Sequence, residues 1–369
     1  MNDLMFSKKG GHNEIQKNIL SGLKQNRLHH AYLFFGPEGT GKDAFALRLA
    51  QLLNCEQNNF EICDRCSSCK KILAFQHPDV HFIFPTPSET NFKNEEYLEL
   101  LQEKAANPYL RIGFPEKNTF IGIDKIRELK REAGFKTYEG KRKVYIFSDA
   151  DHLRPEAANA MLKMLEEPPA NLLLILTTSN MNKILPTIKS RCQLIRFSRL
   201  SEEQIREIVK IFRPDTNEAE LSLIIRLAEY NLKQIFEFLD VDIGSTREHA
   251  LEYLRKLSLI RRSHELMAII ENMGGQRGRR EARQLLWFLL LWFRDMLHFK
   301  NGIIDSAQLT NFDMVENLSA FISYAPNADV QKIVWDIEGA LQDLNDIRNF
   351  NPVLILTTLA FKLNRQIRA

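Results

Sequence analysis

A glycine-rich loop near the N-terminus constrains this chain more than any other feature. The loop occupies residues 36–43 and reads Gly-Pro-Glu-Gly-Thr-Gly-Lys-Asp, between an apolar stretch (31–35) and an amphipathic stretch (44–50). A strand, such a loop and a helix together form a phosphate-binding loop, because glycines let backbone N–H groups surround phosphates at a helix N-terminus. The motif predicts a nucleotide site built from Gly36, Gly39, Thr40, Gly41 and Lys42, with the lysine reaching the outer phosphates.

The residue after the lysine departs from the motif. It is normally Ser or Thr, whose hydroxyl binds Mg²⁺, whereas here it is Asp43. A carboxylate beside a triphosphate is unfavourable, since a like-charge pair at roughly 4 Å is repelled by about 4 kcal/mol at an effective dielectric of about 20. Asp43 could instead bind Mg²⁺ itself, because this ion prefers oxygen ligands. Binding of ATP and Mg²⁺ is therefore left open, and efficient hydrolysis is not expected.

A second apolar stretch, residues 143–147, ends where a phosphate-loop ATPase carries an acidic pair. The first acid of that pair holds Mg²⁺, and the second activates the attacking water. Here the two positions are Ser148 and Asp149. An ordinary buried strand followed by a turn is the alternative. A degenerate ATPase element is favoured, because two independent magnesium positions have changed together.

Four of the five cysteines cluster after the helix that follows the loop. Their spacing is Cys55-x7-Cys63-x2-Cys66-x2-Cys69, and only Cys192 lies elsewhere. In a reducing compartment such clustering indicates a metal rather than disulfides. Four thiolates can enclose a tetrahedral Zn²⁺, which leaves no open position for catalysis. A structural zinc is favoured over four unrelated cysteines or a redox pair.

Length and composition set wider limits. A chain of 369 residues is too long to fold around one ordinary hydrophobic core, so two or three domains are expected. The hydrophobic content of 44% is that of a globular protein, and a net charge of +3 does not require a nucleic-acid partner. The longest apolar run, 285–293, falls well short of the roughly 20 residues of a membrane helix, and the first residues lack a signal-peptide pattern. A cytoplasmic protein without membrane contact is expected.

Strands and helices alternate over the first 200 residues, which favours a parallel sheet covered on both faces. Residues 85–118 are rich in proline and polar residues and predict a surface insertion with one helical pattern near 95–104. Almost everything after residue 200 has a helical pattern. The expected strands are 31–35, 77–84, 143–147, 172–177 and 193–197, and the clearest expected helices are 12–26, 155–166 and 186–190.

Further motifs point to a known family. They are His-His-Ala-Tyr-Leu-Phe at 29–34, Ala-Asn-Ala-Met-Leu-Lys-Met-Leu-Glu-Glu-Pro-Pro at 158–169 and Ser-Arg-Cys at 190–192. With the loop and the four cysteines, they resemble the clamp-loader branch of the AAA+ family. The resemblance is clear over residues 10–83 and 119–200 and weaker beyond, and residues 85–118 have no counterpart in it.

The resemblance implies an α/β fold of three domains. Residues 1–199 would form the AAA+ phosphate-loop domain, a parallel sheet with helices on both faces. This domain would include the zinc module (55–69) and the insertion (85–118). A small helical lid (200–244) and an all-α collar for oligomerisation (245–369) would follow.

The resemblance also assigns roles to individual residues. Arg191 corresponds to an arginine finger that acts in trans on the triphosphate of a neighbouring subunit. Thr177 or Thr178 occupies the first-sensor position of the degenerate nucleotide site. Lys233 occupies the second-sensor position, where motor subunits carry Arg, a better fork for phosphate.

By resemblance, the chain is a non-motor subunit of the bacterial DNA polymerase III clamp loader. It would join gamma/tau and delta subunits in a five-membered ring that loads the sliding clamp onto primed DNA. Independent catalysis would be absent or limited to weak ATPase activity, although the holoenzyme is a DNA-directed DNA polymerase. One alternative is a gamma/tau-type motor in which Asp43 binds Mg²⁺ and Asp149 activates water. Another is a zinc-bearing, nucleotide-binding regulator without ring partners.

Overall fold

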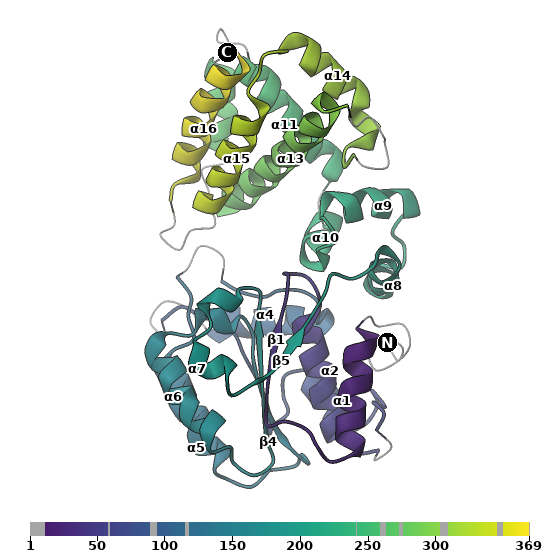
Figure 1. Cartoon of the computed structure of the whole chain (residues 1–369), viewed down its shortest axis with the longest axis vertical. Helices are drawn as coiled ribbons and strands as arrows, with labels where there is room; N and C mark the ends of the chain where they lie inside the picture. The colour runs from purple at the N-terminus through teal and green to yellow at the C-terminus, as the bar shows by residue number, and fades with distance from the viewer. Residues whose placement is uncertain are drawn as a thin grey trace. The chain divides into compact units, whose positions relative to one another are not determined.

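The computed structural model describes residues 12–57, 60–88, 94–114, 118–240, 242–258, 263–272, 276–302, 309–344 and 350–368. The chain divides into two compact units. The first contains the described residues up to Leu221 together with Tyr230–Phe236, and the second contains Ser222–Glu229 and the described residues from Glu237 onward. The first unit is built on a sheet, and the second is helical (Figure 1).

The sheet of the first unit has five parallel strands in the order β2-β3-β4-β1-β5. Each expected strand is present, and the expected strand 77–84 is shorter than predicted. It begins only at Val80, because a turn precedes it in which the Val80 N–H donates to the carbonyl of His77. The strands are β1 (Ala31–Phe35), β2 (Val80–Ile83), β3 (Lys143–Phe147), β4 (Leu172–Thr178) and β5 (Gln193–Arg196).

Helices cover both faces of this sheet, as the sequence predicts (Figure 1). Neighbouring residues of a strand point to opposite faces. Leu33 of β1 belongs to the buried cluster formed with α5, α6 and α7, while Phe34 packs edge-on against Phe45 of α2 with 5.7 Å between ring centroids. The covering helices are α1 (Asn13–Lys24) and α2 (Lys42–Asn54) on one face, and α5 (Ile123–Ala133), α6 (Pro155–Glu166) and α7 (Pro186–Lys189) on the other.

The segment 94–114, within the predicted surface insertion, is buried in part. It begins with α4 (Asn94–Ala106), after which Tyr109, Ile112 and Phe114 are buried. Phe84, which follows β2, stacks on Phe114 with 6.1 Å between ring centroids. These apolar side chains pack the end of the segment onto the domain, whereas Lys104 is the one buried residue of α4.

The described residues after β5 are mostly helical, as expected. The second unit is held together by packing of α13 against α11 and α15, and of α15 against α16. The boundary between the units falls within α9 and α10, so the predicted lid (200–244) is shared between them, and the three-domain division stays a prediction. The helices are α3 (Ser67–Leu73), α8 (Glu202–Phe212), α9 (Glu218–Leu227), α10 (Leu232–Leu239), α11 (Ile243–Ser258), α12 (Ser263–Asn272), α13 (Gln276–Lys300), α14 (Val315–Tyr324), α15 (Val330–Leu344) and α16 (Pro352–Ile367).

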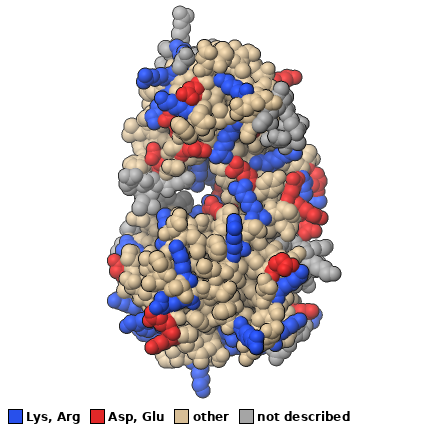
Figure 2. Space-filling model, viewed as in Figure 1, with Lys and Arg blue, Asp and Glu red and all other residues tan. Residues whose placement is uncertain are grey.

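Charged side chains of both signs are mixed over the face of the molecule that Figure 2 shows. On the face shown in Figure 2, Lys and Arg are interspersed with Asp and Glu, in keeping with 50 basic and 47 acidic residues in the chain. Within the described ranges, no helix combines the length and the apolar character needed to cross a membrane.

Candidate nucleotide site

The glycine-rich loop joins β1 to α2 at the carboxyl edge of the sheet, where open α/β sheets bind their ligands. Gly39 and Gly41 have φ angles of +73° and +78°, a region that glycine adopts without strain. A Cβ atom on Gly39 would lie 1.9 Å from Oδ1 of Asn231, the residue before α10. Gly39 is therefore needed for this close approach as well as for the shape of the loop.

The lysine of the motif folds back onto its own loop. The Nζ atom of Lys42 donates to the carbonyl oxygens of Gly36 at 2.9 Å and Pro37 at 2.6 Å. Burial lowers the pKa of Lys42, and the nearby carboxylate of Asp43 opposes that shift. The ammonium that the sequence assigns to phosphate thus binds backbone carbonyls here.

Asp43 brings the two altered magnesium positions together. Its Oδ2 atom accepts a hydrogen bond from the Ser148 hydroxyl at 2.8 Å, and its Oδ1 atom accepts one from Thr177 at 2.7 Å. Lys104 of α4 donates to Oδ2 at 3.2 Å. Burial alone would raise the pKa of Asp43, but the Lys104 charge and the two hydroxyl donors hold that pKa below its usual range. Asp43 is therefore an ionised, fully hydrogen-bonded carboxylate.

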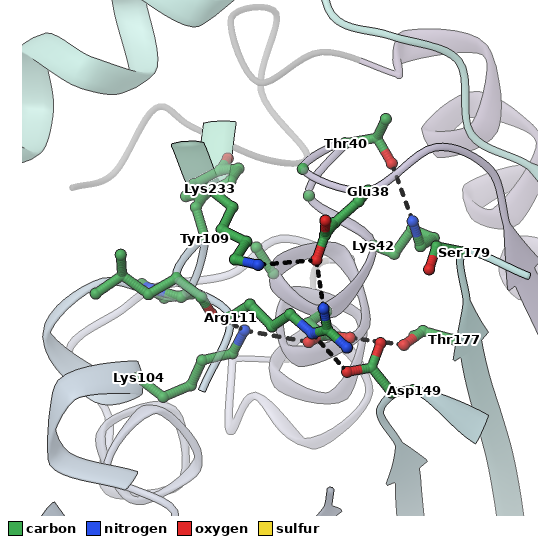
Figure 3. Close-up of a pocket in the computed structure, with 16 residues that line it drawn as sticks. Glu38, Thr40, Lys42, Lys104, Tyr109, Arg111, Asp149, Thr177, Ser179 and Lys233 are labelled. Carbon is green, nitrogen blue, oxygen red and sulfur yellow. Dashed lines mark hydrogen bonds and ion pairs between the residues drawn. The ribbon is translucent and has the colours of Figure 1, made fainter. Parts of the chain in front are cut away.

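Asp149, at the position of the water-activating acid, is engaged by an arginine from the same buried segment as Lys104. The Arg111 guanidinium donates to Asp149 at 2.8 Å and to Glu38 of the loop at 2.5 Å. Lys233 also donates to Glu38, at 3.2 Å (Figure 3). Burial would raise the pKa of Glu38, but Lys233 and Arg111 together lower it to about 2. The predicted second sensor therefore lies in the site, bound to a carboxylate.

Of the two candidate first-sensor threonines, only Thr177 faces the site. The Thr178 hydroxyl donates to Asp151 at 2.6 Å, and Thr178 is not among the residues that line the pocket. The reason is the alternation of side chains along β4, which places neighbours on opposite faces. Of the two residues offered for the first sensor, the structure therefore brings Thr177 and not Thr178 to the pocket, and a role in nucleotide binding stays a prediction.

Arg191 lies outside this pocket. It follows α7, and its guanidinium pairs with Glu166 of α6 at 2.8 Å and donates to the carbonyl of Thr187 at 3.0 Å. The side chains of Arg191 and Glu166 are 34% and 47% exposed. The structure thus separates the predicted arginine finger from the chain's own phosphate loop.

Sequence reasoning missed several residues of the pocket, Lys104 and Arg111 among them, and one residue beside the loop, His12. Lys104 and Arg111 come from the segment taken for a surface insertion. His12 precedes α1, and its Nε2 atom lies 2.9 Å from the carbonyl oxygen of Thr40 in the loop. The apolar residues at 109, 112 and 114 were the available signal that this segment is buried. No local pattern in the sequence distinguishes His12.

The four clustered cysteines converge as predicted. All four sulfur atoms lie within 4.8 Å of one another, which fits a tetrahedral zinc, where Zn–S bonds of about 2.3 Å place sulfurs ~3.8 Å apart. The backbone N–H of Cys66 donates to Cys63 Sγ, and that of Cys69 donates to Cys66 Sγ, each at 3.4 Å. Burial would raise the pKa of Cys63, but backbone donors lower it to about 6. Cys55, Cys63, Cys66 and Cys69 therefore form a group that could hold a metal such as zinc.

The fold and this site define an α/β phosphate-loop protein with a helical C-terminal part. Residues 11–201 match the family model described as DNA polymerase III, delta subunit, and residues 247–365 match the model described as the C-terminal part of that subunit. The first match alone covers more than half of the chain. The chain belongs to this family of clamp-loader proteins.

Individual relatives agree with this assignment. The chain is 32% identical over 199 residues to the DNA polymerase III subunit delta' of Bacillus subtilis, covering 53% of this chain and 51% of that protein. It is 25% identical to the delta' subunit of Escherichia coli over 95% of this chain and 94% of that one. The chain spans about half the length of the Bacillus subtilis relatives, which include a tau subunit. A crystal structure of a gamma-subunit-related protein from Thermotoga maritima shares 20% identity over 95% of this chain and 100% of that chain, with a TM-score of 0.40.

Proposed function

We propose that this chain is a non-motor, delta'-type subunit of the bacterial DNA polymerase III clamp loader. In the cytoplasm it would join gamma/tau and delta subunits in a five-membered ring that uses ATP to place the sliding clamp on primed DNA. The state of Asp43 carries the proposal. Its Oδ1 atom accepts a hydrogen bond from the Thr177 hydroxyl, and its Oδ2 atom accepts one from the Ser148 hydroxyl. Asp43 and Ser148, the residues at the two magnesium positions, are therefore hydrogen-bonded to each other. A site in this state favours a structural role over hydrolysis.

Arg191 would be the contribution of this subunit to catalysis. Its pairing with Glu166 is half-exposed, and such pairs stabilise a protein by only about 0–1 kcal/mol. Arg191 can therefore leave Glu166 at little cost and reach the triphosphate of an adjacent motor subunit. There its planar fork of donors matches phosphate oxygens and stabilises the charge of the transition state.

The Arg191→Ala variant tests this role in a complex reconstituted with gamma/tau and delta subunits. Because an arginine finger contributes roughly 10³-fold or more to turnover, we expect a loss of that order at the site it serves, measured by single-turnover ATP hydrolysis. Lys183→Ala, an exposed cation ahead of α7, is the control and should leave turnover unchanged. Undiminished hydrolysis in an assembled Arg191→Ala complex would refute the finger.

A gamma/tau-type motor is the second candidate, and one observation favours it. The usual hydroxyl and carboxylate of the magnesium site are both present, with their positions exchanged between Asp43 and Ser148. The tau subunit of Bacillus subtilis is also 30% identical over 79% of this chain. Steady ATP turnover by the purified chain, abolished by Lys42→Ala, would establish this candidate over the first.

The proposal also includes a structural zinc and a subunit interface. Zinc held by the four-cysteine group would link α3 to the segment that follows α2. The interface would lie on the exposed face of α15 and α16, where Trp335, Leu354 and Phe361 are 64%, 66% and 76% exposed. Apolar side chains exposed in a row on a helical unit are typical of protein contacts.

A further inference from the structure

The phosphate-loop site is already filled by the chain itself. Its cavity has a volume of only about 50 Å³, against roughly 300–1,000 Å³ for ordinary small-molecule sites. Residues 108–111 line it together with Lys104, opposite the loop (Figure 3). A nucleotide can enter only if this segment moves away.

Lys104 takes the electrostatic place of the metal. It is 1% exposed, so its ammonium group is removed from water and needs a partner. That partner is Asp43, at 3.2 Å, while the Leu110 carbonyl oxygen accepts a second bond at 2.5 Å. The Lys104 ammonium group thus lies beside the Asp43 carboxylate. Asp43 and Ser148 occupy the two positions that would face Mg²⁺ in a standard phosphate-loop site.

Arg111 closes the other side of the site. Its guanidinium joins Asp149 to Glu38, so the loop is tied to the end of β3 through a single side chain. Lys233 adds a second cation on Glu38. The pKa of Arg111 is raised, because the two carboxylates outweigh its burial. Arg111 and Lys233 are therefore paired with carboxylates of the chain, while Lys42 binds backbone carbonyls.

We propose that the segment from Lys104 to Arg111 is an intramolecular ligand of the phosphate loop, which keeps the site closed to magnesium nucleotides. The segment binds through ion pairs. Lys104 pairs with Asp43 in place of the metal, and Arg111 pairs with both Glu38 and Asp149. The inference uses the same site as the proposed function but is independent of Arg191. It would stand even if the finger experiment failed.

Titration of the full chain with a fluorescent ATP analogue, with and without Mg²⁺, tests the proposal. The variants are Lys104→Met with Arg111→Gln, and Arg111→Gln alone. If the open site is populated to one-tenth or less, the apparent affinity of the wild type is reduced about tenfold or more, and the double variant should recover that factor. Adding Lys42→Ala to the double variant should abolish the gain, which places binding at the loop. Lys183→Met with Arg127→Gln alters two exposed cations and should change nothing.

The outcomes separate clearly. Tighter Mg²⁺-dependent binding by the double variant, with a smaller gain for Arg111→Gln, supports the proposal. Wild-type binding as tight as that of the variants overturns it, as does a folded variant without any gain. If the double variant fails to fold because Asp43 loses its buried partner, Arg111→Gln decides, since the Arg111 side chain is 37% exposed and its replacement is tolerated more easily.

Discussion

Glu38 shows how one side chain of the loop depends on its charged neighbours. The residue is a variable position of the motif, yet here its carboxylate accepts from both Arg111 and Lys233. The pKa of Glu38 falls from 4.5 to about 2, so the folded state favours the ionised form. A shift of that size corresponds to at most about 3 kcal/mol of stability. Because the Glu38 side chain is 36% exposed, solvent screening reduces this to about 1 kcal/mol.

A pH dependence follows from this shift. The contribution of Glu38 is complete above about pH 4.5 and is lost as the pH falls from there toward about 2, since the unfolded state binds the proton first. We expect Glu38→Gln to flatten the acid limb of the unfolding free energy, measured by urea titration over that range. Glu14→Gln, whose side chain is 80% exposed, is the control. Identical acid limbs for the wild type and Glu38→Gln would show that the cluster is not formed in solution.

At the scale of elements, α3 and the loop before it depend on the cysteine group. Cys66 caps the N-terminus of α3 by accepting from the Cys69 N–H, and Lys141 of the loop before β3 donates to the carbonyl of Cys55. These contacts lie around the four cysteine sulfur atoms, which come from one short segment of the chain. Metal binding in such a module supplies much of its folding free energy.

Removal of one sulfur tests the zinc proposal. We expect the purified wild-type chain to contain one zinc per chain, and Cys63→Ser to lose most of it, by elemental analysis. A chelator should lower the melting temperature of the wild type more than that of Cys63→Ser. Cys192→Ser lies outside the group and should keep its zinc. A wild-type chain purified without metal, and indifferent to chelator, would contradict the proposal.

At the scale of the whole molecule, the second unit leaves apolar side chains uncovered. Trp335 of α15 and Leu354 of α16 line one hollow of about 380 Å³. Phe361 lies seven residues after Leu354, on the same face of α16. These side chains contribute little to the fold of the single chain, because they remain in contact with water.

Association should therefore depend on them more than stability does. We expect Trp335→Ala and Leu354→Ala to change the free energy of unfolding by no more than about 0.5 kcal/mol. If the proposed interface is correct, each should weaken binding to the other clamp-loader subunits by about 2 kcal/mol or more, by sedimentation or calorimetry. Gln331→Ala, exposed on α15, is the control. Unchanged assembly in both variants would place the interface elsewhere.

Much of this protein follows from local sequence patterns. The strand–loop–helix order, the five strands and the cysteine spacing are properties of neighbouring residues, and each appears in the structure. Asp43 and Ser148 were expected at one site because motifs assign both positions to the same magnesium ion. That they bind each other follows from the parallel sheet, which brings the ends of its strands to one edge.

The occupant of the site was decided by tertiary structure alone. Lys104 and Arg111 lie about sixty or more residues from their partners Asp43 and Glu38, in a segment whose composition resembles a surface loop. The apolar residues at 109, 112 and 114 indicate that this segment packs onto the domain, but which carboxylates Lys104 and Arg111 meet depends on the three-dimensional fold, and no local pattern encodes that pairing. Side chains alternate along β4, so the packing of this strand against α2 decides that Thr177, and not Thr178, contacts Asp43. The sequence determined the site's framework, while long-range charge pairing determined what fills it.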